Sequence, residues 1–469
     1  MKKRQKIQHS NYFSKLTDSL LFIIVSLLPF KQAARTSVLS KQWSHIWHST
    51  KNIEFNENLF VNSQESEEKR GNQRRVFIEF AKKWMLNFRE SSIQNFILTC
   101  SDPGEFLTDI HDIIIFALDH NSKNLTLDFS DPQWDDCDIE EHAAIFALPS
   151  KFYKHQFLES LKLASCKLRV SVFKFGSLKD LSLSWIELRG YDIQTLVNNC
   201  PLLESLSLIK CTGMYELEVS NPNSRLKKLV VDRCSFVFNT SISIDGPQLQ
   251  IFKYSGNVGE FHIEGQKCIQ EAELDFGLEE EFERLGDLLS DLLEQLDSAK
   301  VLTVDSYLLQ VITHGNDPQY CGEGDLETKH LILKTALHAN EFPGIKYLLE
   351  TFTPLEKLTI EIGPLKVLRR YEPRYRFNPG GCWTKNLILY KDTEIDVKEV
   401  EVKGFKGTNN ELFVLQYLLV LARSMEQMNI YLSREVGEDG SNVETYRQRT
   451  VEGVMKFRRS SKTLRISVN

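Results

Sequence analysis

The chain lacks the sequence features that mark most catalytic and cofactor sites. It contains no G-x-S-x-G nucleophile turn, no G-x-x-x-x-G-K-[ST] phosphate loop, no G-x-G-x-x-G fingerprint and no H-E-x-x-H zinc helix. Its nine cysteines form no C-x-x-C pair, and its 11 histidines are scattered. We therefore predict no catalytic residues, no metal and no cofactor, although catalytic groups need not be neighbours in sequence.

The sequence also has little that would suit a membrane or a nucleic acid. The longest apolar run, residues 20–30, spans 11 residues and contains Ser26 and Pro29, whereas a bilayer requires about 20 residues. The basic start MKKRQK is separated from this run by polar residues, and no small-residue cleavage site follows. The net charge is −7, so bulk charge does not favour nucleic acid. We expect the protein to be located in the nucleus and/or the cytoplasm.

What the chain does contain is a repeat. Three segments align without gaps as apolar-x-x-apolar-x-apolar-x-x-Cys: LESLKLASC (158–166), LESLSLIKC (203–211) and LKKLVVDRC (226–234). LKDLSLSWI (178–186) fits the same pattern, with Ile186 in the cysteine position. The second leucines of the four copies are separated by 20, 25 and 23 residues, within the range of about 20–29 for leucine-rich repeats. Looser copies begin at residues 93, 249, 355, 397 and 425.

This pattern predicts a stack of parallel strands. In each copy the Leu-x-Leu alternation points two side chains to one face of a short strand, which only neighbouring repeats can cover. Cys166, Cys211 and Cys234 would occupy small buried positions where the chain turns away from the strand. With 469 residues, 42% of them hydrophobic, the chain has ample material for such an array.

Four other segments give local expectations. Residues 56–75 are polar and charged and read as a flexible linker. Residues 76–88 have helical apolar spacing, which predicts a helix that opens the repeat domain. Residues 278–304 read as an amphipathic helix that runs into a repeat strand, either as a solvated outer face or as an acidic docking surface. Residues 371–392 read as an irregular loop.

The opening 50 residues predict three short helices. Pro29 ends the first helix, the second follows from residue 31, and Trp43 and Trp47 lie four residues apart on one face of the third. So small a bundle cannot bury all of its large apolar side chains. Either the repeat domain covers the surplus or a second protein does, and we favour a partner because large apolar patches mark interfaces.

These opening residues resemble an F-box, the helical module with which substrate receptors dock onto the adaptor of a Skp–cullin–F-box (SCF) ubiquitin ligase. The resemblance rests on DSLLFIIVSLLPFKQAARTSVLSKQW and IWHS; NNCPLLESLSLIKC (198–211) is similar to the repeats of plant F-box proteins, and residues 397–432 are similar to their C-terminal FBD region. Two departures stand out: the family usually has Leu-Pro where this chain has Leu16-Thr17, and the C-terminal ending differs.

The resemblance implies an α/β fold with a three-helix F-box (10–55), a linker (56–75), a leucine-rich-repeat solenoid with irregular repeats (76–370), a loop (371–392) and FBD-like repeats (393–469). It implies a non-catalytic receptor whose partners are a Skp-type adaptor, through it a cullin, and a target protein that the sequence does not identify. The residues expected to face the adaptor or to support that face are Leu16, Leu20, Leu21, Ile24, Leu28, Pro29, Val38, Leu39, Trp43 and Trp47. The alternatives are a repeat scaffold whose F-box-like helices only cap the array, and a receptor that holds a small molecule.

Overall fold

The architecture comes from a computed structural model, which divides into two compact units. The structure describes residues 16–101, 103–134, 146–189, 191–221, 225–264, 269–313, 327–352, 355–368, 395–434 and 443–469. Unit 1 comprises Met1–Glu187 with Asn199–Leu202, and unit 2 comprises Leu188–Asn198 with Leu203–Asn469. The irregular loop predicted at residues 371–392 lies outside the described residues, as do Cys137, Cys268, Cys321 and Cys382.

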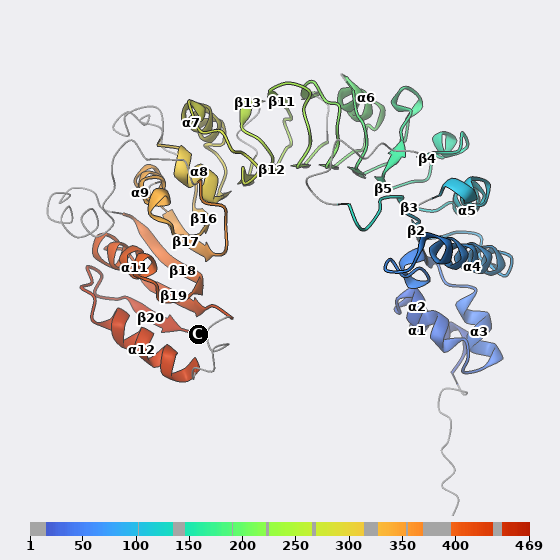
Figure 1. Cartoon of the computed structure of the whole chain (residues 1–469), viewed down its shortest axis with the longest axis horizontal. Coiled ribbons are helices and arrows are strands. Elements are labelled where there is room, and N and C mark those ends of the chain that lie inside the picture. Colours follow the sequence, from blue (N-terminus) through green and yellow to red (C-terminus); the bar gives the residue numbers. More distant parts are fainter. Residues whose placement is uncertain are drawn as a thin grey trace, which may run out of the picture. The chain divides into compact units, whose positions relative to one another are not determined.

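Unit 1 begins with three helices and continues as a parallel sheet in the order β1-β2-β3-β5-β7 (Figure 1). Its helices are α1 (Asp18–Ser26), α2 (Phe30–Thr36), α3 (Lys41–Trp47), α4 (Glu67–Met85) and α5 (Leu107–Asp119), with 3-10 turns η2 (Glu57–Leu59), η3 (Gly104–Phe106), η4 (Phe152–Lys154) and η5 (Val170–Val172). Its strands are β1 (Asn52–Asn56), β2 (Asn95–Thr99), β3 (Asn124–Asp128), β4 (Phe146–Ala147), β5 (Ser160–Ala164), β6 (Cys166–Lys167) and β7 (Asp180–Ser184).

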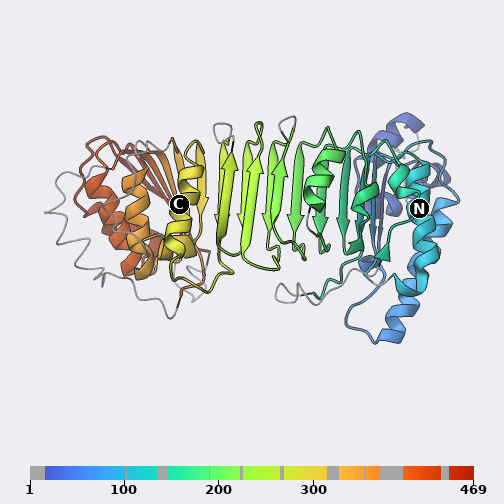
Figure 2. The ribbon, with the colours of Figure 1, turned by 90° about the horizontal axis from the view of Figure 1, so that it is seen from above.

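Unit 2 is built on a parallel sheet whose strands run side by side in the order β8-β10-β12-β14-β15-β16-β17-β18-β19-β20 (Figure 2). These are β8 (Ser205–Ile209), β10 (Lys228–Asp232), β12 (Ile251–Ser255), β14 (Glu271–Asp275), β15 (Val301–Val304), β16 (His330–Thr335), β17 (Leu355–Ile362), β18 (Val397–Phe405), β19 (Gln427–Leu432) and β20 (Arg465–Val468). A second sheet joins β9 (Leu217–Ser220), β11 (Thr240–Asp245) and β13 (Gly259–Glu264).

Helices cover the core side of the unit 2 sheet. They are α6 (Asp192–Asn199), α7 (Leu285–Gln295), α8 (Ser306–Val311), α9 (Phe342–Thr351, preceded by η8, Ala339–Glu341), α11 (Asn409–Leu421) and α12 (Val443–Met455). Side chains alternate along most of the strands: in β8, Leu206 and Leu208 are buried while their neighbours are half-exposed. One face of the sheet therefore forms the core, and the other is open.

The predicted repeats are confirmed. The second leucines of the four best copies lie in β5, β7, β8 and β10, where they occupy equivalent positions: Leu161 is paired with Leu181, and Leu206 with Leu229. The looser copies also fall in strands, which are β2, β12, β17, β18 and β19. The leucine spacing predicted the strand positions because each leucine enters the shared core from the same point of its repeat.

The prediction of buried cysteines is confirmed for two of the three positions. Cys166 and Cys211 are fully buried, whereas Cys234 is half-buried. Burial raises the pKa of the Cys166 thiol to about 12, so this thiol is protonated and unreactive at neutral pH. In each of the four best copies the residue before this position is left-handed, with φ between 50° and 55°: Ser165, Trp185, Lys210 and Arg233. That conformation turns the chain from the strand into the core.

Residues 56–75 differ from the flexible linker that their composition predicted. They contain the end of β1, the turn η2 and the first half of α4, which begins at Glu67 and not near residue 76. Arg74 and Glu57 are both buried, and Arg74 Nε lies 3.1 Å from Glu57 Oε2. The linker prediction is wrong because charged residues can be ordered by pairing with one another, which composition does not reveal.

The acidic segment and the C-terminal tail are both ordered where described. Residues 278–304 contain α7 followed by β15, as the amphipathic pattern predicted, although the helix starts only at Leu285. The tail folds as α12 and β20, and β20 pairs with β19 in the register Gln427 with Arg465. Among the described residues, no helix is long and apolar enough to cross a bilayer. In the same ranges, no group of three or more His, Cys, Asp or Glu could hold a metal ion.

Candidate functional site

The three opening helices form a small bundle with short, well-defined ends. Pro29 precedes α2 and accepts hydrogen bonds at its carbonyl from Gln32 N and Ala33 N, at 2.8 and 2.9 Å. Ser40 caps α3, since its hydroxyl accepts a hydrogen bond from Trp43 N. The Gln42 amide of α3 donates to Asp18 Oδ1 at 2.7 Å, which joins α3 to the first turn of α1.

An aromatic cluster fixes this bundle to the rest of unit 1. Trp47 packs against Phe30 and Trp84, with ring centroids 5.8 and 6.1 Å apart. Phe55 of β1 lies edge-on to both Phe30 and Trp84. Because Trp84 belongs to α4 and Phe55 to the sheet, the bundle is joined to the first repeat by packing of large rings.

A ladder of asparagines adds polar attachment at the same junction. Asn52 of β1 donates its amide to the Ser26 carbonyl at the end of α1, at 3.1 Å. Asn95 donates to the Asn52 side chain and Asn124 donates to Asn95, both at 2.6 Å. The sequence analysis missed this ladder, although the three strands start alike, as NIEF, NFIL and NLTL.

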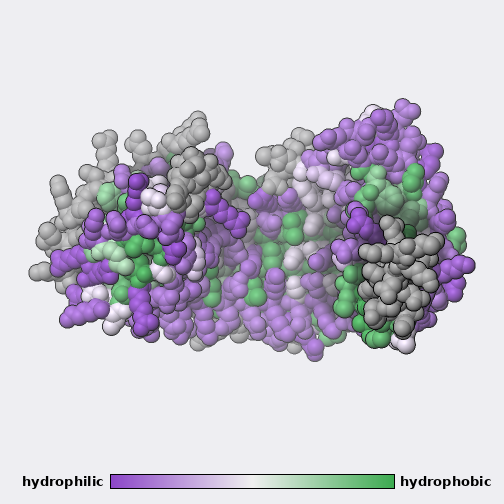
Figure 3. All heavy atoms as spheres, turned by 90° about the horizontal axis from the view of Figure 1, so that it is seen from below, coloured by the Kyte–Doolittle hydropathy of each residue, from purple (hydrophilic) through white to green (hydrophobic). Residues whose placement is uncertain are grey.

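Within the part of the chain that the structure describes, five large apolar side chains of the bundle are exposed. Leu20, Ile23 and Leu27 lie on the outer side of α1, and Val38 and Leu39 lie between α2 and α3. Their exposed fractions are large: 48% for Leu20, 54% for Ile23, 79% for Leu27, 85% for Val38 and 64% for Leu39. We call these five residues the aliphatic row. Figure 3 shows apolar surface gathered at this end of the molecule.

Comparisons with known proteins decide what this bundle is. The F-box domain family matches residues 13–55, and the leucine-rich-repeat domain described as At1g61320/AtMIF1 matches residues 142–308. The F-box/LRR-repeat protein At1g56400 of Arabidopsis thaliana is 33% identical over 476 residues, which cover 97% of this chain and 96% of that protein. The Arabidopsis F-box protein At3g62230 is 34% identical over 425 residues, which cover 89% and 90%.

The chain belongs to the plant F-box/LRR-repeat family. The opening bundle is its F-box, and the parallel sheets behind the F-box form its leucine-rich-repeat solenoid. The expected fold class is thereby confirmed.

The predicted site residues divide into two groups in the structure. Leu20, Val38 and Leu39 are exposed and belong to the aliphatic row, and Pro29 is exposed beside it; Leu16, Ile24 and Leu28 are half-buried. Leu21, Trp43 and Trp47 are buried, with 0%, 5% and 9% of their surface exposed. The prediction missed Ile23 and Leu27, although their spacing of three and seven residues from Leu20 puts all three on one helix face.

The two tryptophans are buried in the structure of the chain alone. The Trp47 ring packs against Trp84 of α4, a residue far away in sequence. The indoles support the F-box from inside, which was the second role allowed for the predicted set. Val38 lies beyond the last turn of α2 and extends into solvent.

Thr17 replaces the proline that usually begins the first F-box helix, and its backbone already suits proline. Its φ is −71° and its ψ 154°, close to the φ of about −65° that a proline ring imposes. We expect Thr17→Pro to raise the free energy of unfolding by about 0.4–1 kcal/mol, because the unfolded chain loses conformational freedom. Thermal unfolding of the full chain measures this, and a lower melting temperature for Thr17→Pro would contradict it.

Proposed function

We propose that this chain is a substrate-recognition subunit of an SCF-type ubiquitin ligase. Its F-box would bind a Skp-type adaptor and through it a cullin, and its repeats would hold a target protein. The observation that carries this proposal is the aliphatic row: five large apolar side chains on the F-box surface that no described part of the chain covers. Exposed apolar patches of this kind mark protein interfaces.

In this role the chain contributes position and not chemistry. A receptor that holds a target beside a ubiquitin-charged enzyme raises the effective concentration of the reacting groups. The junction between F-box and solenoid supports such a role, because the aromatic cluster and the asparagine ladder fix the F-box to the first strands of unit 1. A target held by the repeats of that unit would then keep a defined place relative to the adaptor.

The C-terminal strands and helices from Val397 onward would correspond to the FBD region of such receptors. They consist of β18, α11, β19, α12 and β20, which continue the sheet of unit 2. We place the complex in the nucleus and/or the cytoplasm.

Co-expression with a plant Skp-type adaptor tests the proposal. The chain and the adaptor should elute from a sizing column as one complex, and adding the cullin should shift both to a larger species. Separate elution of a folded chain and a folded adaptor would contradict it. Capture from plant extract under proteasome inhibition then separates the partners: proteins lost when the aliphatic row is altered belong to the ligase, and those retained are target candidates.

A second candidate is a repeat scaffold in which the F-box only caps the array. The burial of Trp43 and Trp47 against the chain favours it, because a cap packs on its own repeats. The aliphatic row argues against it, since a cap needs a polar outer face to remain soluble. Under this alternative the full chain would bind no adaptor but would still capture a target.

A further inference from the structure

The open face of the unit 2 sheet contains a hollow. Its volume is about 200 Å³, and its lining comes from three neighbouring strands, β10, β12 and β14. The residues that line it are Val230, Val231, Asp232, Lys253, Tyr254, Ser255, Glu273 and Asp275. Figure 3 shows apolar surface between polar groups on the open face. The hollow lies on a surface that repeat proteins commonly use for binding.

The register of the strands places two carboxylates on either side of a serine. Asp232 is paired with Ser255, and Ser255 with Asp275, at the carboxyl ends of β10, β12 and β14. Because neighbouring strands are about 4.8 Å apart, the two aspartates stand roughly 10 Å apart at the backbone. The space above Ser255 is therefore wide enough for one cationic group between them. Val230, at the next outward position of β10, provides an apolar wall.

The lysine at the rim of the hollow is already occupied. Lys253 Nζ lies 2.7 Å from Glu271 and 2.9 Å from Glu273. Glu273 also contacts Lys334 at 2.6 Å. Burial alone would raise the pKa of Glu273, but the hydrogen bonds and charges of Lys334 and Lys253 outweigh it and lower the pKa. The ammonium groups of Lys253 and Lys334 are thus already paired with the carboxylates of Glu271 and Glu273.

The carboxylates at the far end of the hollow have weaker contacts. Asp232 Oδ1 lies 3.8 Å from Nε of the Arg233 guanidinium. Asp275 accepts from the backbone N–H of Gly277 at 3.0 Å and from the Ser255 hydroxyl at 3.4 Å. The charged residues that line the hollow are three carboxylates, Asp232, Glu273 and Asp275, and one lysine, Lys253.

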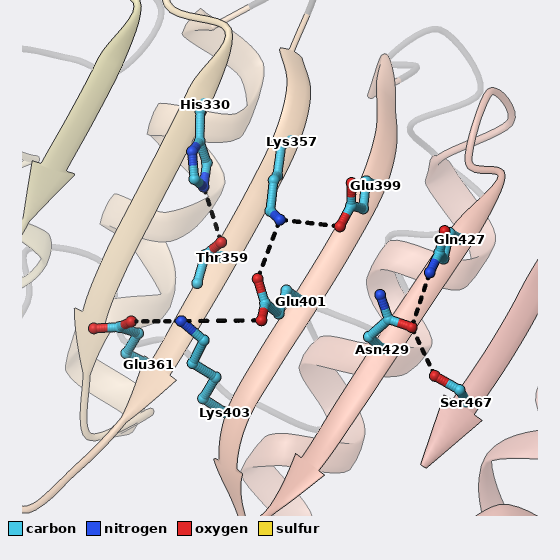
Figure 4. Close-up of polar contacts among 10 residues, drawn as sticks. All are labelled: His330, Lys357, Thr359, Glu361, Glu399, Glu401, Lys403, Gln427, Asn429 and Ser467. Carbon is cyan, nitrogen blue, oxygen red and sulfur yellow. Dashed lines mark hydrogen bonds and ion pairs between the residues drawn. The ribbon is translucent and has the colours of Figure 1, made fainter. Parts of the chain in front are cut away.

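The open face of the C-terminal strands is different, because each carboxylate drawn in Figure 4 is paired with a lysine. Figure 4 shows Lys357 between Glu399 and Glu401, at 3.0 and 3.2 Å, and Lys403 at 3.0 Å from Glu361. Farther along, the Gln427 amide and the Ser467 hydroxyl both donate to Asn429 (Figure 4). A partner that bound here would have to replace these contacts, whereas the hollow combines free volume with an excess of negative charge.

We propose that the hollow receives a basic side chain from the target protein. The aliphatic stem would lie against Val230, and the cationic head would lie between Asp232 and Asp275, above Ser255. The target segment that crosses the open face is accordingly basic. This assignment rests on the proposed function in one respect: the bound protein is called a target because the chain is proposed to be a receptor.

A labelled peptide of alternating serine and lysine, with the full chain, tests the assignment by fluorescence anisotropy. The same peptide with acetyl-lysine keeps the stem and loses the charge. We expect Asp232→Asn/Asp275→Asn, and separately the acetylation, to weaken binding about tenfold or more. The matched control is Glu426→Gln/Glu452→Gln, which changes the net charge equally at two exposed sites far along the chain; it should leave the affinity within about twofold.

Three results would overturn the assignment: no binding of the lysine peptide, equal binding of the acetylated peptide, or equal weakening by the control variant. Capture of the adaptor by Asp232→Asn/Asp275→Asn keeps the two proposals apart. If the variant binds the adaptor but the expected differences in peptide binding are not seen, the hollow does not receive the basic side chain, and the receptor role stands. If the peptide results hold and no adaptor binds even the unaltered chain, the receptor role fails and the basic-segment site remains.

Discussion

Replacing Leu27 and Val38 with aspartate should eliminate adaptor binding and leave the chain folded. Both side chains are almost fully exposed, so their removal opens no cavity in the F-box. An adaptor that covers the aliphatic row would lose two apolar contacts and bury two unpaired charges. With at least about 2 kcal/mol lost per residue, the affinity should fall roughly a thousandfold or more. Titration calorimetry of the adaptor into the full chain measures this.

The matched control is the substitution of two equally apolar, exposed residues outside the F-box. Leu86→Asp/Val76→Asp introduces the same charges at Val76 of α4 and at Leu86, the residue that follows α4; both side chains are exposed, and the variant should not change adaptor affinity. Unaltered binding by Leu27→Asp/Val38→Asp, with a melting temperature like that of the unaltered chain, would show that the adaptor does not use the aliphatic row.

The second large effect concerns the buried ion pair between Glu57 and Arg74. It joins the turn after β1 to α4, and Ser101 beyond β2 donates a hydrogen bond to the same carboxylate. Glu57→Leu leaves the Arg74 charge buried and without this partner. We therefore expect the free energy of unfolding to fall by about 3–5 kcal/mol. Urea unfolding followed by tryptophan fluorescence is a suitable readout, because five of the six tryptophans lie in unit 1.

A double variant separates this charge effect from lost packing. Glu57→Leu/Arg74→Met removes both charges and should be clearly more stable than Glu57→Leu alone. If the stability lost by the double variant, relative to the unaltered chain, equalled the sum of the losses of the two single variants, the two groups would not be coupled.

The same ion pair predicts how stability depends on pH. Burial alone would raise the Glu57 pKa, but the Ser101 hydrogen bond and the Arg74 hydrogen bond and charge lower it below its ordinary value. A carboxyl whose pKa is lower in the folded state stabilises the chain above its unfolded pKa, and this contribution disappears as the pH falls through the folded pKa. The stability gap between the unaltered chain and Glu57→Leu should therefore narrow in acid.

The repeats could be predicted from the sequence because their determinants are local. Leu-x-Leu in a strand and a small residue at the following turn repeat at short intervals, so LESLKLASC and LESLSLIKC predict β5 and β8 without knowledge of their neighbours. The three F-box helices were predictable for the same reason, since Pro29 and Ser40 act on the residues directly beside them.

The contacts between these elements could not be read in the same way. Trp47 was expected to face the adaptor or to support that face, and its packing on Trp84, 37 residues later in the chain, could not be read from the sequence. The polar stretch around Glu57 and Arg74 looked like a linker because its charges are complementary only once α4 folds back on the turn. Both cases concern where a side chain is covered, which depends on pairs that are distant in sequence.

Hydrogen exchange of the full chain with and without a Skp-type adaptor tests the central claim most directly. If the adaptor covers the aliphatic row, exchange should slow over residues 18–39, which carry Leu20, Ile23, Leu27, Val38 and Leu39, and should stay unchanged over the strands from β8 to β20. Unchanged exchange over residues 18–39 in a saturated complex, with protection confined to the repeat strands, would contradict the claim.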